Sequence, residues 1–141
     1  IGVVGIGYLG KYHLEKFINN KQCNTKWVVD TNLDNIDLNG HDLIQKSLNY
    51  KEIINDIDAV SLVTPTKMHF KIAKFFLENK KHVLIEKPMT ETVAQAKKLV
   101  DLAKKNKVIL QVGHLERFNP VMKRLTKEIS DPLFIEVSCC S

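Results

Sequence analysis

The chain opens with Ile1-Gly2-Val3-Val4-Gly5-Ile6-Gly7-Tyr8-Leu9-Gly10, where a short apolar strand runs directly into a Gly-x-Gly-x-x-Gly turn. The residues that follow, 9–20, have the spacing of a helix. Asp30 stands 20 residues after Gly10, at the end of a second apolar strand over 26–30. A glycine-rich turn alone is weak support, but strand, turn, helix and acidic residue in this order indicate a dinucleotide-binding unit.

In such a unit the three glycines and the aspartate have distinct roles. Gly5 allows the tight turn, Gly7 lets the backbone approach a pyrophosphate, and Gly10 lets helix and strand pack closely. The pyrophosphate would lie at the positive end of the helix. Asp30 would accept hydrogen bonds from the adenosine ribose and repel a 2′-phosphate, so NAD is expected rather than NADP. The alternative is a structural turn beside a surface aspartate.

The rest of the chain alternates short apolar strands with amphipathic helices. This pattern predicts an α/β fold, a doubly wound, mostly parallel Rossmann sheet with helices on both faces. Residues 31–49 are less clear and suggest a short helix and a weak third strand. The other expected strands are 59–63, 82–85 and 108–112, and the expected helices are a small one over 50–55, then 67–79 with Thr66 as N-cap, 91–105 and 116–129.

Ligands of such sheets bind beyond the carboxyl ends of the strands, so the residues just after each strand matter most. The suggestive side chains all fall at these places: Gly5–Gly10, Asp30, Thr64–Thr66, Glu86–Pro88 and Gly113–Asn119. Trp27, three residues before Asp30, is expected to report on a bound cofactor by fluorescence.

Composition narrows the class of protein. With 141 residues, 44% hydrophobic and 26% charged, the chain is typical of one soluble globular domain. The three cysteines form no metal or disulfide pattern, which favours a reducing, cytoplasmic setting and no metal site. No apolar run is long enough to span a membrane. The net charge of +5 comes mostly from scattered lysines, so we expect no nucleic-acid partner.

A Glu86-Lys87-Pro88 turn follows the strand over 82–85. A lysine facing a cleft can act as an acid or a base, and proline after it can be cis, although an isolated lysine in a turn is more often a surface residue. The chain also contains Val63-Thr64-Pro65-Thr66 with His69, and Gln111-Val112-Gly113-His114. Together with the glycine turn, these motifs resemble those of the glucose–fructose oxidoreductase, inositol dehydrogenase and rhizopine-catabolism (Gfo/Idh/MocA) family over nearly the whole chain.

The resemblance implies a role for each matching residue. The glycine turn (Gly5, Gly7, Tyr8, Leu9, Gly10) and Asp30 would bind the cofactor, Thr64, Pro65 and His69 would line its nicotinamide side, and Glu86 would lie near the nicotinamide ribose. Lys87 is the family's lysine that contacts the reacting hydroxyl and helps to move its proton. For His69 and His114, positioning of a loop is as good an interpretation as ligand contact.

The stretch Gly113-His114-Leu115-Glu116-Arg117-Phe118-Asn119-Pro120 is similar to the branch that oxidises the 3-hydroxyl of UDP-N-acetylglucosamine or a related UDP-sugar. This similarity implies that Arg117 and Asn119 contact a nucleotide-sugar substrate. A same-family dehydrogenase for inositol, a free sugar or biliverdin is the near alternative. A non-catalytic NAD(H)-binding sensor or interaction module is the alternative from another class.

The resemblance also implies two domains. Residues 1–130 correspond to the NAD-binding domain, and 131–141, with a strand expected over Leu133–Val137, begin the substrate domain. The family's second domain carries most of the substrate pocket and a histidine that partners the lysine, and it often mediates homo-oligomers. We therefore expect residues 1–141 to bind cofactor better than they turn over substrate.

Overall fold

The chain forms a parallel sheet of the doubly wound type, as the sequence predicts. The structure is a computed structural model and describes residues 1–38, 40–129, 131, 134 and 136. Within these residues six strands pair in the order β3-β2-β1-β4-β5-β6, and every pairing is parallel. The strands are β1 (Gly2–Val4), β2 (Trp27–Val29), β3 (Gln45–Ser47), β4 (Ala59–Leu62), β5 (His82–Ile85) and β6 (Leu110–Val112).

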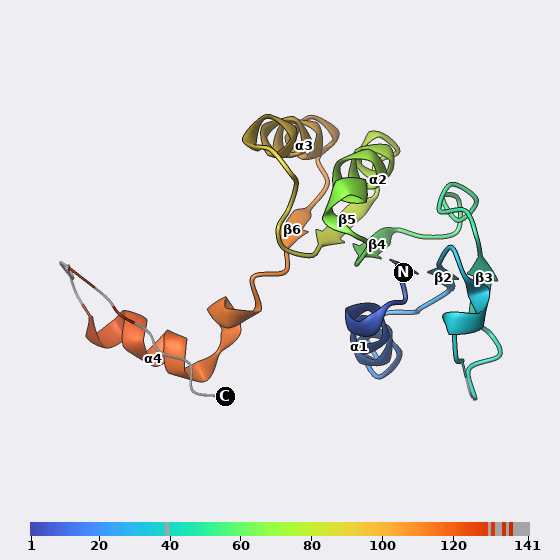
Figure 1. Cartoon of the computed structure of the whole chain (residues 1–141), viewed down its shortest axis with the longest axis horizontal. Helices are drawn as coiled ribbons and strands as arrows, with labels where there is room; N and C mark the ends of the chain where they lie inside the picture. The colour runs from blue at the N-terminus through green and yellow to red at the C-terminus, as the bar shows by residue number, and fades with distance from the viewer. Residues whose placement is uncertain (39, 130, 132–133, 135, 137–141) are drawn as a thin grey trace.

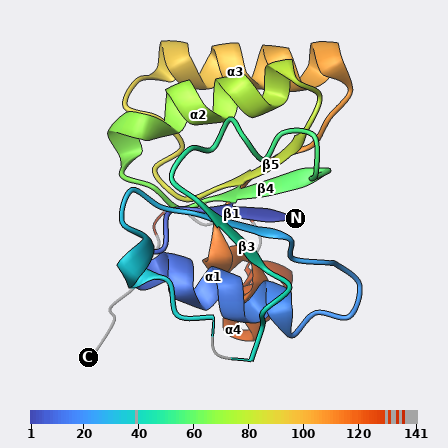
Figure 2. The ribbon, with the colours of Figure 1, turned by 90° about the vertical axis from the view of Figure 1, so that its right-hand side faces the viewer.

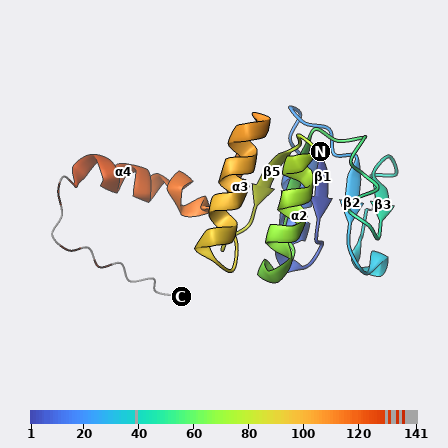
Figure 3. The same cartoon turned by 90° about the horizontal axis from the view of Figure 1, so that it is seen from above.

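Helices cover both faces of this sheet (Figures 1 and 2). Helix α1 (Tyr8–Ile18) lies on one face, whereas α2 (Thr66–Glu78) and α3 (Val93–Asn106) pack side by side on the other. After β6 the chain forms the short η2 (Leu115–Phe118) and then α4 (Pro120–Glu128), which extends away from the sheet (Figure 3). No helix among the described residues has the length and apolar character needed to cross a membrane.

Each face of the sheet has its own hydrophobic core. The register of β1 and β2 pairs Val3 with Val28 and Val4 with Val29. The two valines of each pair point to the same face of the sheet, and the two pairs point to opposite faces. Val3 and Val28 pack in the cluster under α1, and Val4 and Val29 pack in the cluster under α2 and α3. Burial on both faces explains why these strands are continuously apolar rather than alternating.

The region 31–58 is less regular than the rest. It contains the short helix and third strand expected over 31–49, as η1 (Leu33–Asn35) and β3. The small helix expected over 50–55 is wrong, because these residues form turns. The Asn49 side chain accepts from the Lys51 amide (3.1 Å), and a segment this short cannot offset helix nucleation.

Two helix limits also differ from prediction. Thr66 is the first residue of α2 rather than its N-cap; the cap position is Pro65, which has no side-chain bond to the helix. The single helix expected over 116–129 is divided into η2 and α4, because the residue before proline is driven to extended backbone. Most of the strand expected over Leu133–Val137, together with Cys139 and Cys140, lies outside the described residues.

Candidate active site at the carboxyl edge of the sheet

The turn between β1 and α1 requires two of its glycines. Gly5 has φ of +92°, and a Cβ there would lie 2.7 Å from the Val63 carbonyl oxygen. A Cβ on Gly10 would lie 1.9 Å from the Gly5 carbonyl oxygen. Only glycine fits either position, so the turn brings the start of α1 directly against the carboxyl end of β1.

Gly7 stands in open space instead. It occupies the N-cap of α1 without a side-chain cap, and no atom lies within 4 Å of where its Cβ would be. The first amides of α1 therefore face this space without a capping side chain, at the positive end of the helix. Such a site suits a bound phosphate.

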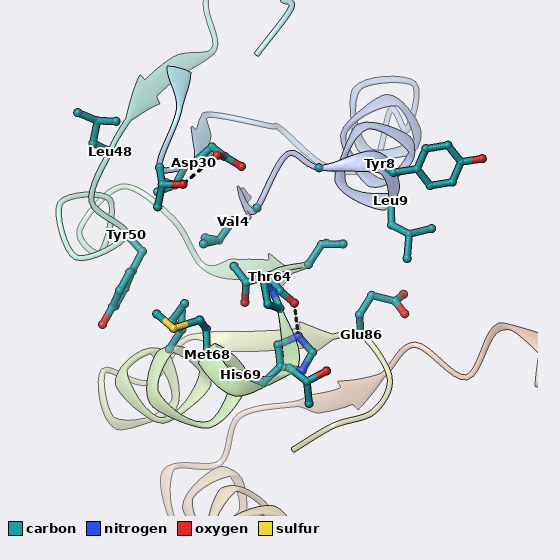
Figure 4. A pocket seen from close by; sticks show the side chains of 18 of the residues that line it. Val4, Tyr8, Leu9, Asp30, Leu48, Tyr50, Thr64, Met68, His69 and Glu86 are labelled. Carbon is teal, nitrogen blue, oxygen red and sulfur yellow. Dashed lines mark hydrogen bonds between the residues drawn. The ribbon is translucent and has the colours of Figure 1, made fainter. Parts of the chain in front are cut away.

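Asp30 directly follows β2, lines the cavity (Figure 4) and is bonded to the glycine turn. Its Oδ2 accepts from the Ile6 amide at 2.6 Å, and its Oδ1 accepts from the Asn32 amide at 3.0 Å and from the Thr31 hydroxyl at 3.5 Å. Each carboxylate oxygen offers about two acceptor sites, so Oδ2 keeps capacity for a hydroxyl donor. The Ile6 bond sets the carboxylate beside the helix terminus, where a ribose joined to the phosphate would lie.

These groups open on one cavity of about 730 Å³ at the carboxyl ends of β1, β2, β4 and β5. It is large enough for a cofactor. Apolar side chains that the sequence did not indicate also line the cavity: Leu48, Tyr50 and Met68 (Figure 4), and Ile72. Leu48 and Tyr50 directly follow β3, which is the strand that the sequence indicated least clearly.

His69 joins two loops of this cavity. It is 1% exposed, and its ring nitrogens lie 2.7 Å from the Thr64 carbonyl oxygen and 3.0 Å from the Pro88 carbonyl oxygen. The ring also contributes to the cavity lining. The two contacts to backbone support the loop-positioning interpretation of His69. The Thr64 hydroxyl beside it is buried and has no partner among the described residues, which leaves it available to a ligand.

Glu86 and Lys87 reach the cavity from the end of β5. The Glu86 carboxylate is buried and lies 3.2 Å from His13 Nε2, and its other oxygen accepts from the Lys87 amide at 3.1 Å. Lys87 is exposed and lines the cavity, and the Lys87–Pro88 peptide bond is cis. The lysine is thus presented to the same space as Gly7 and Asp30.

A family model described as "Oxidoreductase family, NAD-binding Rossmann fold" matches residues 1–114. The chain belongs to the Gfo/Idh/MocA oxidoreductase family. NAD is therefore the cofactor of this family domain, and the open space at Gly7, the remaining acceptor site of Asp30 Oδ2 and the unpartnered Thr64 hydroxyl fit it.

Several relatives are similar to this Gfo/Idh/MocA domain. The chain is 32% identical to UDP-N-acetylglucosamine 3-dehydrogenase of Acidithiobacillus ferrooxidans over 125 residues, which are 88% of the chain and 39% of that enzyme. It is 33% identical to scyllo-inositol 2-dehydrogenase (NAD(+)) of Bacillus subtilis (strain 168), covering 84% of the chain and 36% of that enzyme. A protein of gentamicin A biosynthesis, solved in complex with NAD, superposes with a TM-score of 0.83 at 26% identity, covering 92% of the chain and 38% of the other. The chain thus spans about two fifths of the length of these relatives.

The glycine turn of this family domain also carries two exposed aromatic rings. Tyr8 is 78% exposed and meets Tyr12 edge-on, with ring centroids 5.4 Å apart. A hydrogen bond with Tyr8 raises the pKa of Tyr12, so the Tyr12 phenol remains neutral near pH 7. Tyr8 and Leu9 line the mouth of the cavity, where the sequence places cofactor contacts.

Three residues that were predicted from the sequence to contact or report on a ligand are not among the described residues that line the cavity. Arg117, in η2, and Asn119, before α4, are not among its lining residues in the described part of the chain. The Asn119 side chain caps α4 by accepting from the Val121 amide at 3.0 Å. Trp27, at the start of β2, donates to Asp56 and is not among the described residues that line the cavity.

Proposed function

We propose that the protein is an NAD-dependent dehydrogenase that oxidises a secondary hydroxyl of a nucleotide sugar, with the 3-hydroxyl of UDP-N-acetylglucosamine as the first candidate. The observation that carries the proposal is the presence of Lys87 on the same cavity as Gly7 and Asp30. A pure NAD(H) sensor or interaction module has no need of a lysine there. The 32% identity to a UDP-N-acetylglucosamine 3-dehydrogenase supports this sugar.

In this proposal the cofactor lies along the carboxyl edge of the sheet. Its pyrophosphate meets the start of α1, and its adenosine ribose donates to Asp30. Its nicotinamide end lies near the Thr64 hydroxyl and Glu86. The full set of proposed cofactor contacts is Gly5, Gly7, Tyr8, Leu9, Gly10, Asp30, Thr64, Pro65, His69, Glu86 and Lys87.

Oxidation of a secondary alcohol to a ketone removes a hydride from the carbon and a proton from its hydroxyl. Bound NAD supplies the hydride acceptor. Lys87, together with a histidine of the substrate domain, accepts the hydroxyl proton and returns it in the reverse direction. Lys87 is exposed in this chain, so shielding from water must come from the bound ligands and from further protein.

The substrate side of the site extends past the cofactor domain. We place the domain limit near residue 130, with 131–141 leading into a substrate domain that also provides the homo-oligomer contact. Arg117 and Asn119 lie in the last part of the cofactor domain, in η2 and before α4, and would reach the nucleotide sugar from there. The sequence has three cysteines without a disulfide or metal-binding spacing, and this pattern favours a cytoplasmic enzyme.

Lys87→Ala in the complete protein tests the proposed role of the lysine. We expect turnover of UDP-N-acetylglucosamine to fall by about 10²-fold or more, because the proton acceptor is lost. The Kd for NADH should change by less than about twofold, because truncating the side chain leaves the phosphate and ribose sites intact. A variant that keeps turnover within about tenfold of wild type would remove Lys87 from the chemistry.

The near alternative is a same-family dehydrogenase for an inositol, a free sugar or biliverdin. The 33% identity to a scyllo-inositol 2-dehydrogenase favours it. A panel of UDP-N-acetylglucosamine, UDP-glucose, scyllo-inositol, myo-inositol, glucose and biliverdin with NAD⁺ or NADH separates the two, since kcat/KM ranks the substrates. Saturable NADH binding without turnover of any of them would favour the sensor.

A further inference from the structure

A row of hydrogen-bonded side chains, Ser61, His13 and Glu86, ends at the residue next to Lys87. His13, on α1, lies 2.8 Å from the Ser61 hydroxyl through Nδ1 and 3.2 Å from Glu86 Oε1 through Nε2. Ser61 belongs to β4 and is fully buried, and Glu86 is 6% exposed. The contacts therefore join α1, β4 and the end of β5 inside the protein.

The chemistry of Glu86 fixes the direction of one of these bonds. A carboxylate can only accept, so His13 Nε2–H donates to Glu86 Oε1. The Ser61 hydroxyl can donate or accept, so it pairs with His13 Nδ1 in either case. The second Glu86 oxygen accepts from the Lys87 amide. The row thus ends on the backbone of the lysine.

Gly113 packs closely against the same carboxylate. A Cβ on Gly113 would lie 2.5 Å from Glu86 Oε1, so any larger residue would displace it. The amide of Gly113 is itself fixed to the Ile85 carbonyl oxygen at 2.8 Å. His13 and Gly113 together confine the Glu86 side chain to one position.

We propose that His13 is a positioning residue that orders Lys87 through Glu86. The inference rests on the proposed role of Lys87, and His13 is not among the described residues that line the cavity. Without the His13 donor, the buried carboxylate loses a charge-assisted hydrogen bond and turns toward water in the cavity. The Lys87 amide then loses its acceptor, and the backbone from which the lysine side chain extends is no longer held in place.

Two substitutions of similar polarity separate this role from general packing. His13→Asn places its side-chain amide near the position of Nδ1, where it can still bond to Ser61, but the side chain is too short to reach Glu86. His13→Gln places an amide donor near the position of Nε2. His41→Ala serves as the control, because His41 is exposed and lies outside the cavity.

The first readout is hydrogen exchange of the Lys87 amide in this chain without cofactor. We expect exchange to be about tenfold faster or more in His13→Asn and within about threefold of wild type in His13→Gln and His41→Ala. The amides of Val60 and Leu62 in β4 report on the core and should not change. Unchanged Lys87 exchange in His13→Asn, or equal acceleration at Val60 and Leu62, overturns the inference.

The second readout is turnover of UDP-N-acetylglucosamine by the complete protein. His13→Asn should lower kcat by about ten- to a hundredfold and leave KM for NAD⁺ within about twofold, with kcat recovered in His13→Gln. Adding Glu86→Gln to His13→Asn should cost little more than Glu86→Gln alone, because both act through one contact. If the wild type oxidises no sugar of the panel, the proposed function fails, and the Lys87 exchange still decides the role of His13.

Discussion

Individual residues of the glycine turn differ in why they must be glycine, and this difference can be measured. Gly10→Ala puts a Cβ 1.9 Å from the Gly5 carbonyl oxygen and should destabilise the fold by about 3 kcal/mol or more. Gly7→Ala meets nothing within 4 Å and has φ of −68°, so its melting temperature should stay within about 2 °C of wild type. The added methyl group occupies the space before α1, so NADH affinity should fall about tenfold or more. Thermal melts and NADH titration check both variants, and normal NADH affinity in Gly7→Ala would move the phosphate elsewhere.

Asp30 carries the choice of cofactor. NADH should bind wild type at least about tenfold more tightly than NADPH, because the carboxylate repels a 2′-phosphate. Asp30→Asn removes the charge but keeps an oxygen for the Ile6 amide, so the preference should fall toward equality without loss of the turn. The measurement is a titration that follows the fluorescence of NADH and, separately, of NADPH. A preference unchanged in Asp30→Asn would contradict this role.

At the same scale, the sequence indicated some of the residues that line the cavity and missed others for physical reasons. Gly5, Gly7, Asp30 and Lys87 could be predicted because each lies in a segment that follows a strand. The Glu86 contact with His13 could not, since it depends on the rotation of α1 about its axis. A serine within the apolar strand β4 was the available sign that a buried polar partner was needed.

Among the elements, long periodic ones were predicted well and short ones were not. Helices α2 and α3 differ by one or two residues from the ranges expected, because their apolar faces repeat over three or more turns. The turns over 50–56 and the break before Pro120 depend instead on local hydrogen bonds and backbone limits, which outweigh periodicity in short segments.

The α4 N-cap provides an element-scale test of the two interpretations of Asn119. Asn119→Ala should destabilise α4, and Asn119→Ser should restore the cap, because serine also accepts from the N2 or N3 amide. If Asn119 only caps, turnover by the complete protein should be near wild type in Asn119→Ser. If its amide contacts the sugar nucleotide, as we propose, Asn119→Ser should remain about tenfold or more below wild type. Circular dichroism and kcat/KM together distinguish the outcomes.

The whole molecule divides into the sheet with its packed helices and an extension that contains α4. In the order β3-β2-β1-β4-β5-β6, strands β2 and β3 are added on one side of β1, and β4, β5 and β6 are added on its other side. The cavity opens at this switch point between β1 and β4. Every buried hydrophobic side chain of the two cores lies between Val3 and Ala103. Val121 and Ile129 on the α4 extension remain 64% and 40% exposed.

This division predicts where the chain can be shortened. A chain ending at Phe118 removes α4 but keeps β6 and Gly113, which packs against Glu86, so it should unfold cooperatively within about 3 °C of residues 1–141. Its Kd for NADH should be within about twofold, because no proposed cofactor contact lies beyond Lys87. A chain ending at Asn106 is the matched control; it loses β6, whose Leu110 and Val112 pack against the core, and should not fold. Loss of cooperative unfolding already at Phe118 would mean that the sheet and its helices need α4 for their stability.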